Sequence, residues 1–107
     1  CLEVFGSLVG LFQYTDVNQA IHSVGASDFG LQAGIFTSDN AIIHRAFEEI
    51  EVGGLMVNDV STFRIDHMPY GGVKQSGFGR EGLRYAIEEM TGASVPLLAC
   101  MPNASAP

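Results

Sequence analysis

Two side chains near the start of the chain are of types that could contact a sugar and a planar ring. Glu3 and Phe5 stand directly before Gly6, separated by one residue. The two oxygens of a carboxylate match the vicinal hydroxyls of a sugar, and an aromatic side chain can pack on a planar ring. The alternative is an exposed acid beside a phenylalanine of the core.

A second group of polar residues lies in the middle of the chain, where no regular element is expected. Arg64, Asp66 and His67 follow one another closely there. Loops on an α/β scaffold are where binding residues concentrate, so this segment is a candidate ligand contact. The alternative is a local ion pair between Arg64 and Asp66 on a solvated turn.

The segment from Gly77 to Gly82 has the glycine spacing of a dinucleotide-binding turn. That turn works only when a strand leads into its first glycine and an acid follows about 20 residues later. The residues before Gly77 do not resemble a strand, and Pro102 and Asn103 stand where the acid is required. The segment therefore favours a tight turn before a helix. A nucleotide-binding domain built on it is the less favoured alternative.

The cysteines and histidines do not form a recognisable reactive centre. Cys1 and Cys100 have no adjacent cation or base that would make a nucleophilic thiolate. His22 and His44 fall beside the apolar stripes of expected helices, which predicts surface histidines. Because the histidines lack the spacing of metal ligands, no metal site is expected.

Composition limits the class of protein. A chain of 107 residues suits one domain or part of one. Its formal charge of −7 argues against a nucleic-acid partner. No apolar run approaches the roughly 18–20 residues that span a bilayer, and no signal-peptide pattern opens the sequence. Two cysteines do not make a disulfide framework, so a reducing, cytoplasmic location is expected.

Apolar periodicity predicts alternating strands and helices in the first half of the chain. The expected strands cover residues 8–14, 31–36 and 55–57, and the expected helices follow caps at Asp16 and Asp39. The second helix carries the stripe Ile43, Ala46, Phe47 and Ile50. This alternation predicts an α/β fold in which helices pack on a partial parallel sheet. Residues 58–82 are expected to be loop, followed by a helix over residues 81–90.

Several segments together resemble the C-terminal part of the aldehyde dehydrogenase catalytic domain. These segments are Glu3-Val4-Phe5-Gly6, Phe29-Gly30-Leu31-Gln32-Ala33-Gly34-Ile35-Phe36-Thr37, Gly53-Gly54-Leu55-Met56-Val57-Asn58 and Pro69-Tyr70-Gly71-Gly72-Val73-Lys74-Gln75-Ser76-Gly77-Phe78-Gly79-Arg80-Glu81. They occur in the order that this superfamily uses. The resemblance assigns residues 1–91 to that portion of the domain and leaves residues 92–107 as an atypical, flexible tail.

The resemblance implies oxidation of an aldehyde to a carboxylic acid with NAD or NADP as cofactor. In this superfamily a cysteine attacks the aldehyde, hydride leaves to the nicotinamide, and a glutamate-activated water releases the acid. Glu3 matches the glutamate that holds the nicotinamide ribose hydroxyls, and Phe5 matches the aromatic that packs near the nicotinamide. Asn58, Phe63 and Tyr70 resemble the wall of the substrate tunnel. The nucleophile and the base of the superfamily lie upstream of Glu3, so the isolated chain is expected to be inactive.

The loop over residues 60–68 is similar to that of members that oxidise small hydroxylated or anionic aldehydes, such as lactaldehyde or glyceraldehyde 3-phosphate. Arg64 could meet the anionic end of such a substrate. The implied partners are the aldehyde, the rest of the enzyme chain and a homo-oligomer. A noncatalytic module that docks on intact subunits is the other alternative to a catalytic portion.

Overall fold

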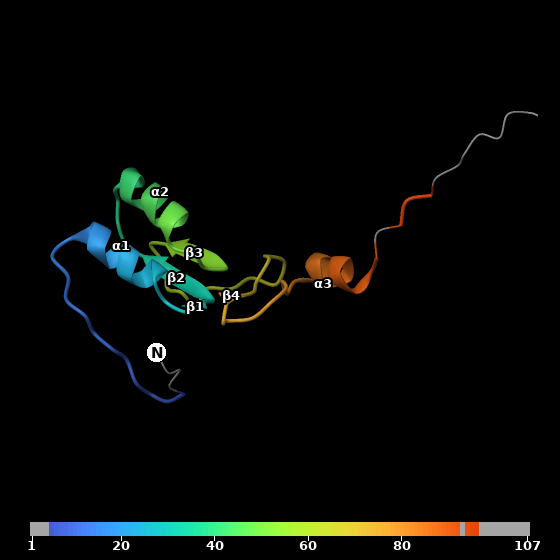
Figure 1. Ribbon diagram of the computed structural model, residues 1–107, viewed down its shortest axis with the longest axis horizontal. Coiled ribbons are helices and arrows are strands. Elements are labelled where there is room, and N and C mark those ends of the chain that lie inside the picture. Colours follow the sequence, from blue (N-terminus) through green and yellow to red (C-terminus); the bar gives the residue numbers. More distant parts are fainter. Residues whose placement is uncertain (1–4, 93, 97–107) are drawn as a thin grey trace, which may run out of the picture.

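The computed structural model describes residues 5–92 and 94–96. Helices and strands alternate along most of this range, and Figure 1 shows them gathered around the first two helices, with the last helix set apart. The elements are α1 (Val17–Gly25), β1 (Phe29–Gly30), β2 (Gln32–Ile35), α2 (Asn40–Glu49), β3 (Gly54–Val57), β4 (Val73–Lys74) and α3 (Leu83–Met90).

Both early helices begin where the sequence predicts. The Asp16 carboxylate accepts a hydrogen bond from Asn18 N at 2.9 Å, and Asp39 Oδ1 accepts one from Ala41 N at 2.8 Å. Each bond satisfies a backbone donor that the first turn of a helix leaves unpaired. Arg45 then joins the two helices, because its Nη1 donates to Asn18 Oδ1. The caps confirm both predicted starts.

The predicted parallel pairing is present between β2 and β3. Gln32 lies opposite Gly54, and Ile35 lies opposite Val57. The helix α2 makes the connection between these strands, as a parallel pair requires. The expected α/β arrangement is therefore correct for this part of the chain.

The core lies where α1 and α2 cover this pair of strands. Its buried members are Ile21 of α1, Ala46 of α2 and Ile50 at the end of α2. Partly buried apolar residues surround them, namely Val17, Ala33, Ile35, Ile42, Val52 and Leu55. The apolar stripe of α1 thus faces the sheet, as amphipathic helices do.

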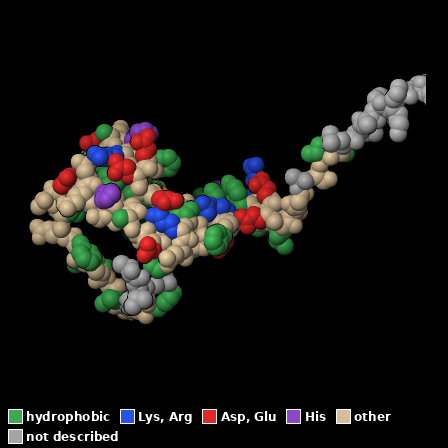
Figure 2. Space-filling model, viewed as in Figure 1, with side chains coloured by type: hydrophobic (Ala, Val, Ile, Leu, Met, Phe, Trp, Pro, Cys, Tyr) green, Lys and Arg blue, Asp and Glu red, His purple; other side chains and the backbone are tan. Residues whose placement is uncertain are grey.

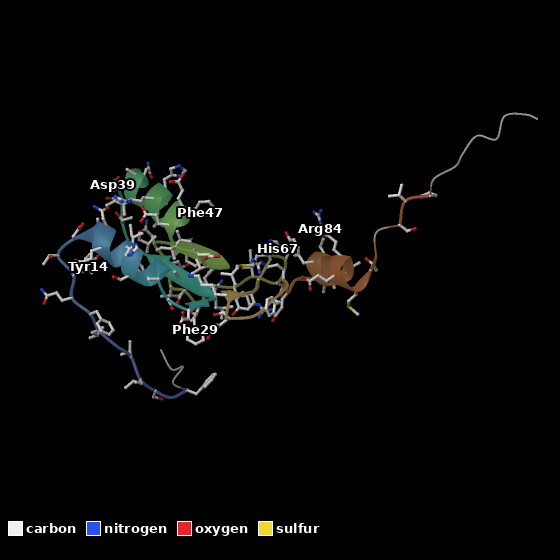
Figure 3. All side chains as sticks on the ribbon, in the orientation of Figure 1. Tyr14, Phe29, Asp39, Phe47, His67 and Arg84 are labelled. Atoms are coloured by element: carbon white, nitrogen blue, oxygen red, sulfur yellow. The ribbon has the colours of Figure 1, made fainter. Side chains whose placement is uncertain are left out.

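The predicted stripe of α2 is only partly correct. Ala46 is fully buried, but Phe47 leaves 70% of its surface exposed and projects from the helix (Figure 3). Neighbouring positions on a helix point about 100° apart, so Ala46 and Phe47 cannot both face a narrow contact. Ile42, rather than Phe47, completes the line of residues that meets the core.

The strand predicted over residues 8–14 is wrong. Residues 5–16, here called the N-terminal arm, contain no strand and run away from the sheet (Figure 1). Leu11 and Phe12 are 89% and 92% exposed. A strand needs a neighbour for its backbone donors and acceptors, and none of the described strands pairs with the arm.

The expected loop over residues 58–82 contains an unpredicted strand. Val73–Lys74 forms β4 and pairs antiparallel with β1, with Phe29 opposite Lys74. The sheet content is therefore mixed rather than purely parallel. A two-residue strand has no periodicity to detect, which explains why the sequence gives no signal for it.

The last helix forms within its predicted range and makes few apolar contacts. None of the residues of α3 is buried, and Leu83 and Met90 are 82% and 85% exposed. Apolar side chains stand out on the arm and at the α3 end of the molecule (Figure 2). Of the helices in the described ranges, none has the length and apolar character to cross a membrane.

Candidate functional site

A cavity of about 270 Å³ brings together two of the predicted substrate-contacting residues. Arg64 and Tyr70 line it from the loop that follows β3. The remaining lining residues are Leu31, Gln32, Ser61 and Thr62. The residues that line the cavity carry a guanidinium, an amide and several hydroxyl groups, and most of the surface that faces the cavity is apolar. These groups suit a small polar ligand that accepts and donates hydrogen bonds.

The Arg64 side chain is held in place on two sides. Its guanidinium carbon lies 4.5 Å from the centre of the Tyr70 ring, a cation–π arrangement. Its Nη2 donates to Glu81 Oε2 at 2.7 Å. The expected local pair with Asp66 is therefore not the contact that orients Arg64, since its carboxylate partner lies 17 residues along the chain.

A short backbone pairing brings Glu81 to Arg64. Tyr70 and Glu81 form an isolated antiparallel bridge, with Tyr70 N donating to Glu81 O at 3.2 Å and Glu81 N donating in return. The bridge closes the glycine-rich loop between them. No local sequence pattern marks Glu81 as a site residue, because its nearness to Arg64 depends on this long-range pairing.

Asn58 has a structural task at the end of β3. Its Oδ1 accepts a hydrogen bond from Thr37 N at 2.9 Å, and its N donates to Ile35 O at 2.7 Å. Its φ of 57° is left-handed, a conformation that asparagine tolerates better than most residues. Asn58 therefore turns the chain from β3 into the loop. A role in contacting substrate stays a prediction.

Phe63 is not among the residues that line the cavity, and its backbone is hydrogen-bonded to one that is. Gln32 Nε2 donates to Phe63 O at 3.4 Å, which ties the loop to β2. The Phe63 side chain is 42% exposed. Its predicted place in the wall of a substrate tunnel stays a prediction.

Of the two predicted cofactor contacts, the structure describes only Phe5. Glu3 lies outside the described residues, as do Cys1 and Cys100. Phe5 belongs to the N-terminal arm and is 90% exposed. Both cofactor assignments stay predictions. His22 and His44 are exposed, as expected for surface histidines.

The turn from Gly77 to Gly82 does not form a dinucleotide cradle. Gly79 and Gly82 have φ values of 78° and 112°, which explains the need for glycine there. The Arg80 backbone N–H donates to Glu89 Oε1 at 2.9 Å, so a carboxylate already occupies that donor. The nearest strand, β4, is antiparallel to its neighbour and ends before the turn. These facts agree with the predicted tight turn.

Lys74 attaches the loop to the body of the molecule. Its Nζ donates to Gly25 O at 2.8 Å and to Ser27 O at 3.0 Å. A cation at the carboxyl end of α1 also interacts favourably with the helix dipole. Ser76 adds a second attachment by accepting a hydrogen bond from Gly30 N. No sequence signal marked Lys74, since its partners lie far away along the chain.

Comparison with known proteins assigns the family. The model of the aldehyde dehydrogenase family matches residues 1–95. The chain belongs to the aldehyde dehydrogenase family. The match includes the cavity residues and the glycine turn, and it agrees with the resemblance found in the sequence.

Relatives in this family differ in the aldehyde that they are named for. The chain is 60% identical over 89 residues to the 3-sulfolactaldehyde dehydrogenase of Priestia megaterium, covering 83% of this chain and 19% of that protein. It is 43% identical over 90 residues to a lactaldehyde dehydrogenase of Methanococcus maripaludis, covering 84% of this chain and 19% of that protein. The chain thus spans about a fifth of the length of these aldehyde dehydrogenases.

Solved structures of aldehyde dehydrogenases contain the same arrangement of elements. Aldehyde dehydrogenase 21 from Physcomitrella patens, in complex with succinate, matches with a TM-score of 0.69 and 45% identity, covering 72% of this chain and 16% of that chain. Glyceraldehyde-3-phosphate dehydrogenase from Methanocaldococcus jannaschii, complexed with NADP, matches with a TM-score of 0.68 and 46% identity, covering 71% of this chain and 17% of that chain.

Proposed function

We propose that this chain is part of a cytoplasmic, NAD- or NADP-dependent enzyme that oxidises a short hydroxylated or anionic aldehyde, such as lactaldehyde, to its carboxylic acid. The observation that carries the proposal is the cavity lined by Gln32, Ser61, Thr62 and Arg64. Hydroxyl and amide groups can hydrogen bond to a hydroxylated chain, and a guanidinium can bind an anionic end. The names of the relatives point to the same classes of aldehyde.

The chain's own residues would bind and orient the substrate rather than break bonds in it. Arg64 and Tyr70 form the wall of the cavity, and Asn58 and Phe63 place the loop that carries this wall. Glu3 and Phe5 would contact the nicotinamide nucleoside. The described residues form no dinucleotide cradle, so these contacts depend on other parts of the enzyme. We expect the purified chain to be inactive and to show no saturable binding of NAD.

A hybrid enzyme tests the proposal. The matching segment of the Priestia megaterium enzyme, 60% identical over 89 residues, is replaced by that of this chain. The hybrid should oxidise lactaldehyde and 3-sulfolactaldehyde with a kcat/KM at least about tenfold above that for a long alkanal, a difference of about 1.4 kcal/mol. A hybrid that binds NAD and prefers the alkanal would contradict the proposed substrate class.

Arg64→Ala in this hybrid tests the role of the guanidinium. Loss of a hydrogen bond to a charged group should lower kcat/KM for 3-sulfolactaldehyde by about tenfold more than for the alkanal. Arg84→Ala is the matched control, because Arg84 forms an exposed ion pair with Glu88 and points away from the rest of the molecule (Figure 3). Equal losses of kcat/KM for all substrates would show that Arg64 does not determine substrate specificity.

A noncatalytic docking module is the second candidate function. The exposed apolar residues of the arm and of α3, including Phe12 and Leu83, favour contact with another protein surface. Such a module would copurify with intact subunits when the two are produced together and would become soluble in their presence. Saturable NAD binding by the chain alone would instead favour an independent nucleotide-binding domain.

A further inference from the structure

The positive charge that lines the cavity already has a partner. Arg64 Nη2 lies 2.7 Å from Glu81 Oε2, and both side chains are about half exposed, at 48% and 63%. A carboxylate at this distance offsets much of the field that a guanidinium presents to a third group. An anionic substrate entering the cavity would therefore meet a paired cation.

The pair lies between two hollows of the surface. Arg64 lines the cavity of about 270 Å³ described above. Glu81 lines a neighbouring cavity of about 220 Å³. Tyr70 and Leu31 line both cavities. Glu81 therefore does not line the first cavity, and reaches it only through its ion pair with Arg64.

We infer that Glu81 is a specificity-determining residue, which sets how strongly this cavity favours anionic over neutral short aldehydes by pairing with Arg64. The inference rests on the proposed function, since it concerns the same cavity. The guanidinium has five N–H donors and keeps some of them after pairing with one carboxylate. Arg64 can therefore still bind a hydroxyl or an anion, but with a weakened preference for the anion.

One substitution can remove the negative charge of Glu81 without disturbing the backbone of the glycine-rich loop. The bridge between Tyr70 and Glu81 uses backbone atoms alone. Glu81→Gln leaves this bridge intact and preserves an oxygen that can accept a hydrogen bond from Arg64. The change in net charge is then the principal difference between the two proteins.

Lactaldehyde and 3-sulfolactaldehyde form a matched substrate pair, because they differ by one sulfonate group. In the hybrid enzyme, Glu81→Gln should raise the ratio of kcat/KM for 3-sulfolactaldehyde to that for lactaldehyde by about fivefold at low ionic strength. In about 0.5 M salt the rise should shrink toward twofold, because salt screens half-exposed charges. Glu88→Gln is the control, since it breaks a similar exposed pair on α3.

A double variant tests whether the effect passes through Arg64. In an Arg64→Gln background, Glu81→Gln should no longer change the ratio, because the pair is already broken. An unchanged or lowered ratio in the single variant would overturn the inference. The same rise in both backgrounds would overturn it as well, since Glu81 would then act on the substrate directly or through the general field.

A measurement without turnover separates this inference from the proposed function. In the purified chain, Glu81→Gln should speed modification of Arg64 by phenylglyoxal at least about threefold, since the carboxylate no longer covers the guanidinium. Modification of Arg84 provides the internal control. Equal rates at Arg64 would overturn the inference even if the hybrid oxidised neither aldehyde, a result that would contradict the proposed function instead.

Discussion

Two amphipathic helices, α1 and α3, differ in how much of their apolar surface is buried. Both α1 and α3 carry apolar residues at helical spacing. Ile21 of α1 is 3% exposed, whereas Leu83 and Met90 of α3 are 82% and 85% exposed. The spacing of apolar residues specifies which side of a helix is apolar. It does not specify which surface will cover that side.

This difference in burial follows from the elements that each helix packs against. The helices α1 and α2 contact each other and cover the parallel pair β2 and β3, so their apolar side chains leave water together. Polar contacts attach α3 instead, through the backbone bridge at Glu81 and the bond from Arg80 N to Glu89. Tertiary packing supplies most of the stability of short helices, so we expect α1 to be much the more stable of the two.

The largest expected effect comes from Gly53, which lies just before β3. A Cβ at Gly53 would overlap the carbonyl oxygen of Gly71, so Gly53→Ala requires the backbone of the loop to move. We expect a loss of at least about 3 kcal/mol in the free energy of unfolding, measured by urea titration followed by circular dichroism. Gly92→Ala is the control, because its Cβ would meet no atom within 4 Å. Similar losses in the free energy of unfolding for both variants would contradict the close approach of Gly53 to Gly71.

Truncating one apolar residue in each helix tests the comparison directly. Ile21→Ala removes a buried side chain and should lower the free energy of unfolding by about 2–3 kcal/mol. Ile87→Ala removes a side chain that is 55% exposed, and should change it by less than about 0.5 kcal/mol. Equal losses in the two variants would show that another surface covers α3 in solution.

The smallest expected effect concerns the helix caps. Asp39→Ala removes the acceptor for Ala41 N and should cost about 1 kcal/mol. Asp39→Asn keeps a capping oxygen and should retain most of the stability. The N-cap residue of α3 is Gly82, which provides no side-chain hydrogen bond, so α2 should also exchange its first amide protons more slowly than α3. Faster exchange in α2 than in α3 would contradict this order.

Local patterns predicted the elements whose contacts are local or follow a simple repeat. The caps at Asp16 and Asp39, both early helices and the parallel pairing agree with the sequence analysis. The arm does not. Its apolar run resembles a buried strand, but a strand is stabilised by hydrogen bonds to another strand, and the arm makes no such pairing within the described residues.

The candidate site also contains residues that the sequence predicted and residues that depend on contacts between distant segments. The resemblance placed Tyr70 in the wall of a substrate tunnel, Arg64 was predicted to meet an anionic end of the substrate, and the structure brings these two side chains into contact. Glu81 was missed because its nearness to Arg64 depends on a backbone bridge across a glycine-rich loop. Lys74 was missed because its acceptors at Gly25 and Ser27 are distant in the sequence.

The three helices, the starts of α1 and α2, the glycine turn and the family could be read from the amino-acid sequence alone. These depend on side-chain periodicity, on caps within a few residues and on backbone conformations that glycine permits. The covered apolar surfaces and the carboxylate that pairs with Arg64 are set by tertiary contacts. Both depend on pairings between segments far apart in the chain, and the pattern within either segment does not encode its partner.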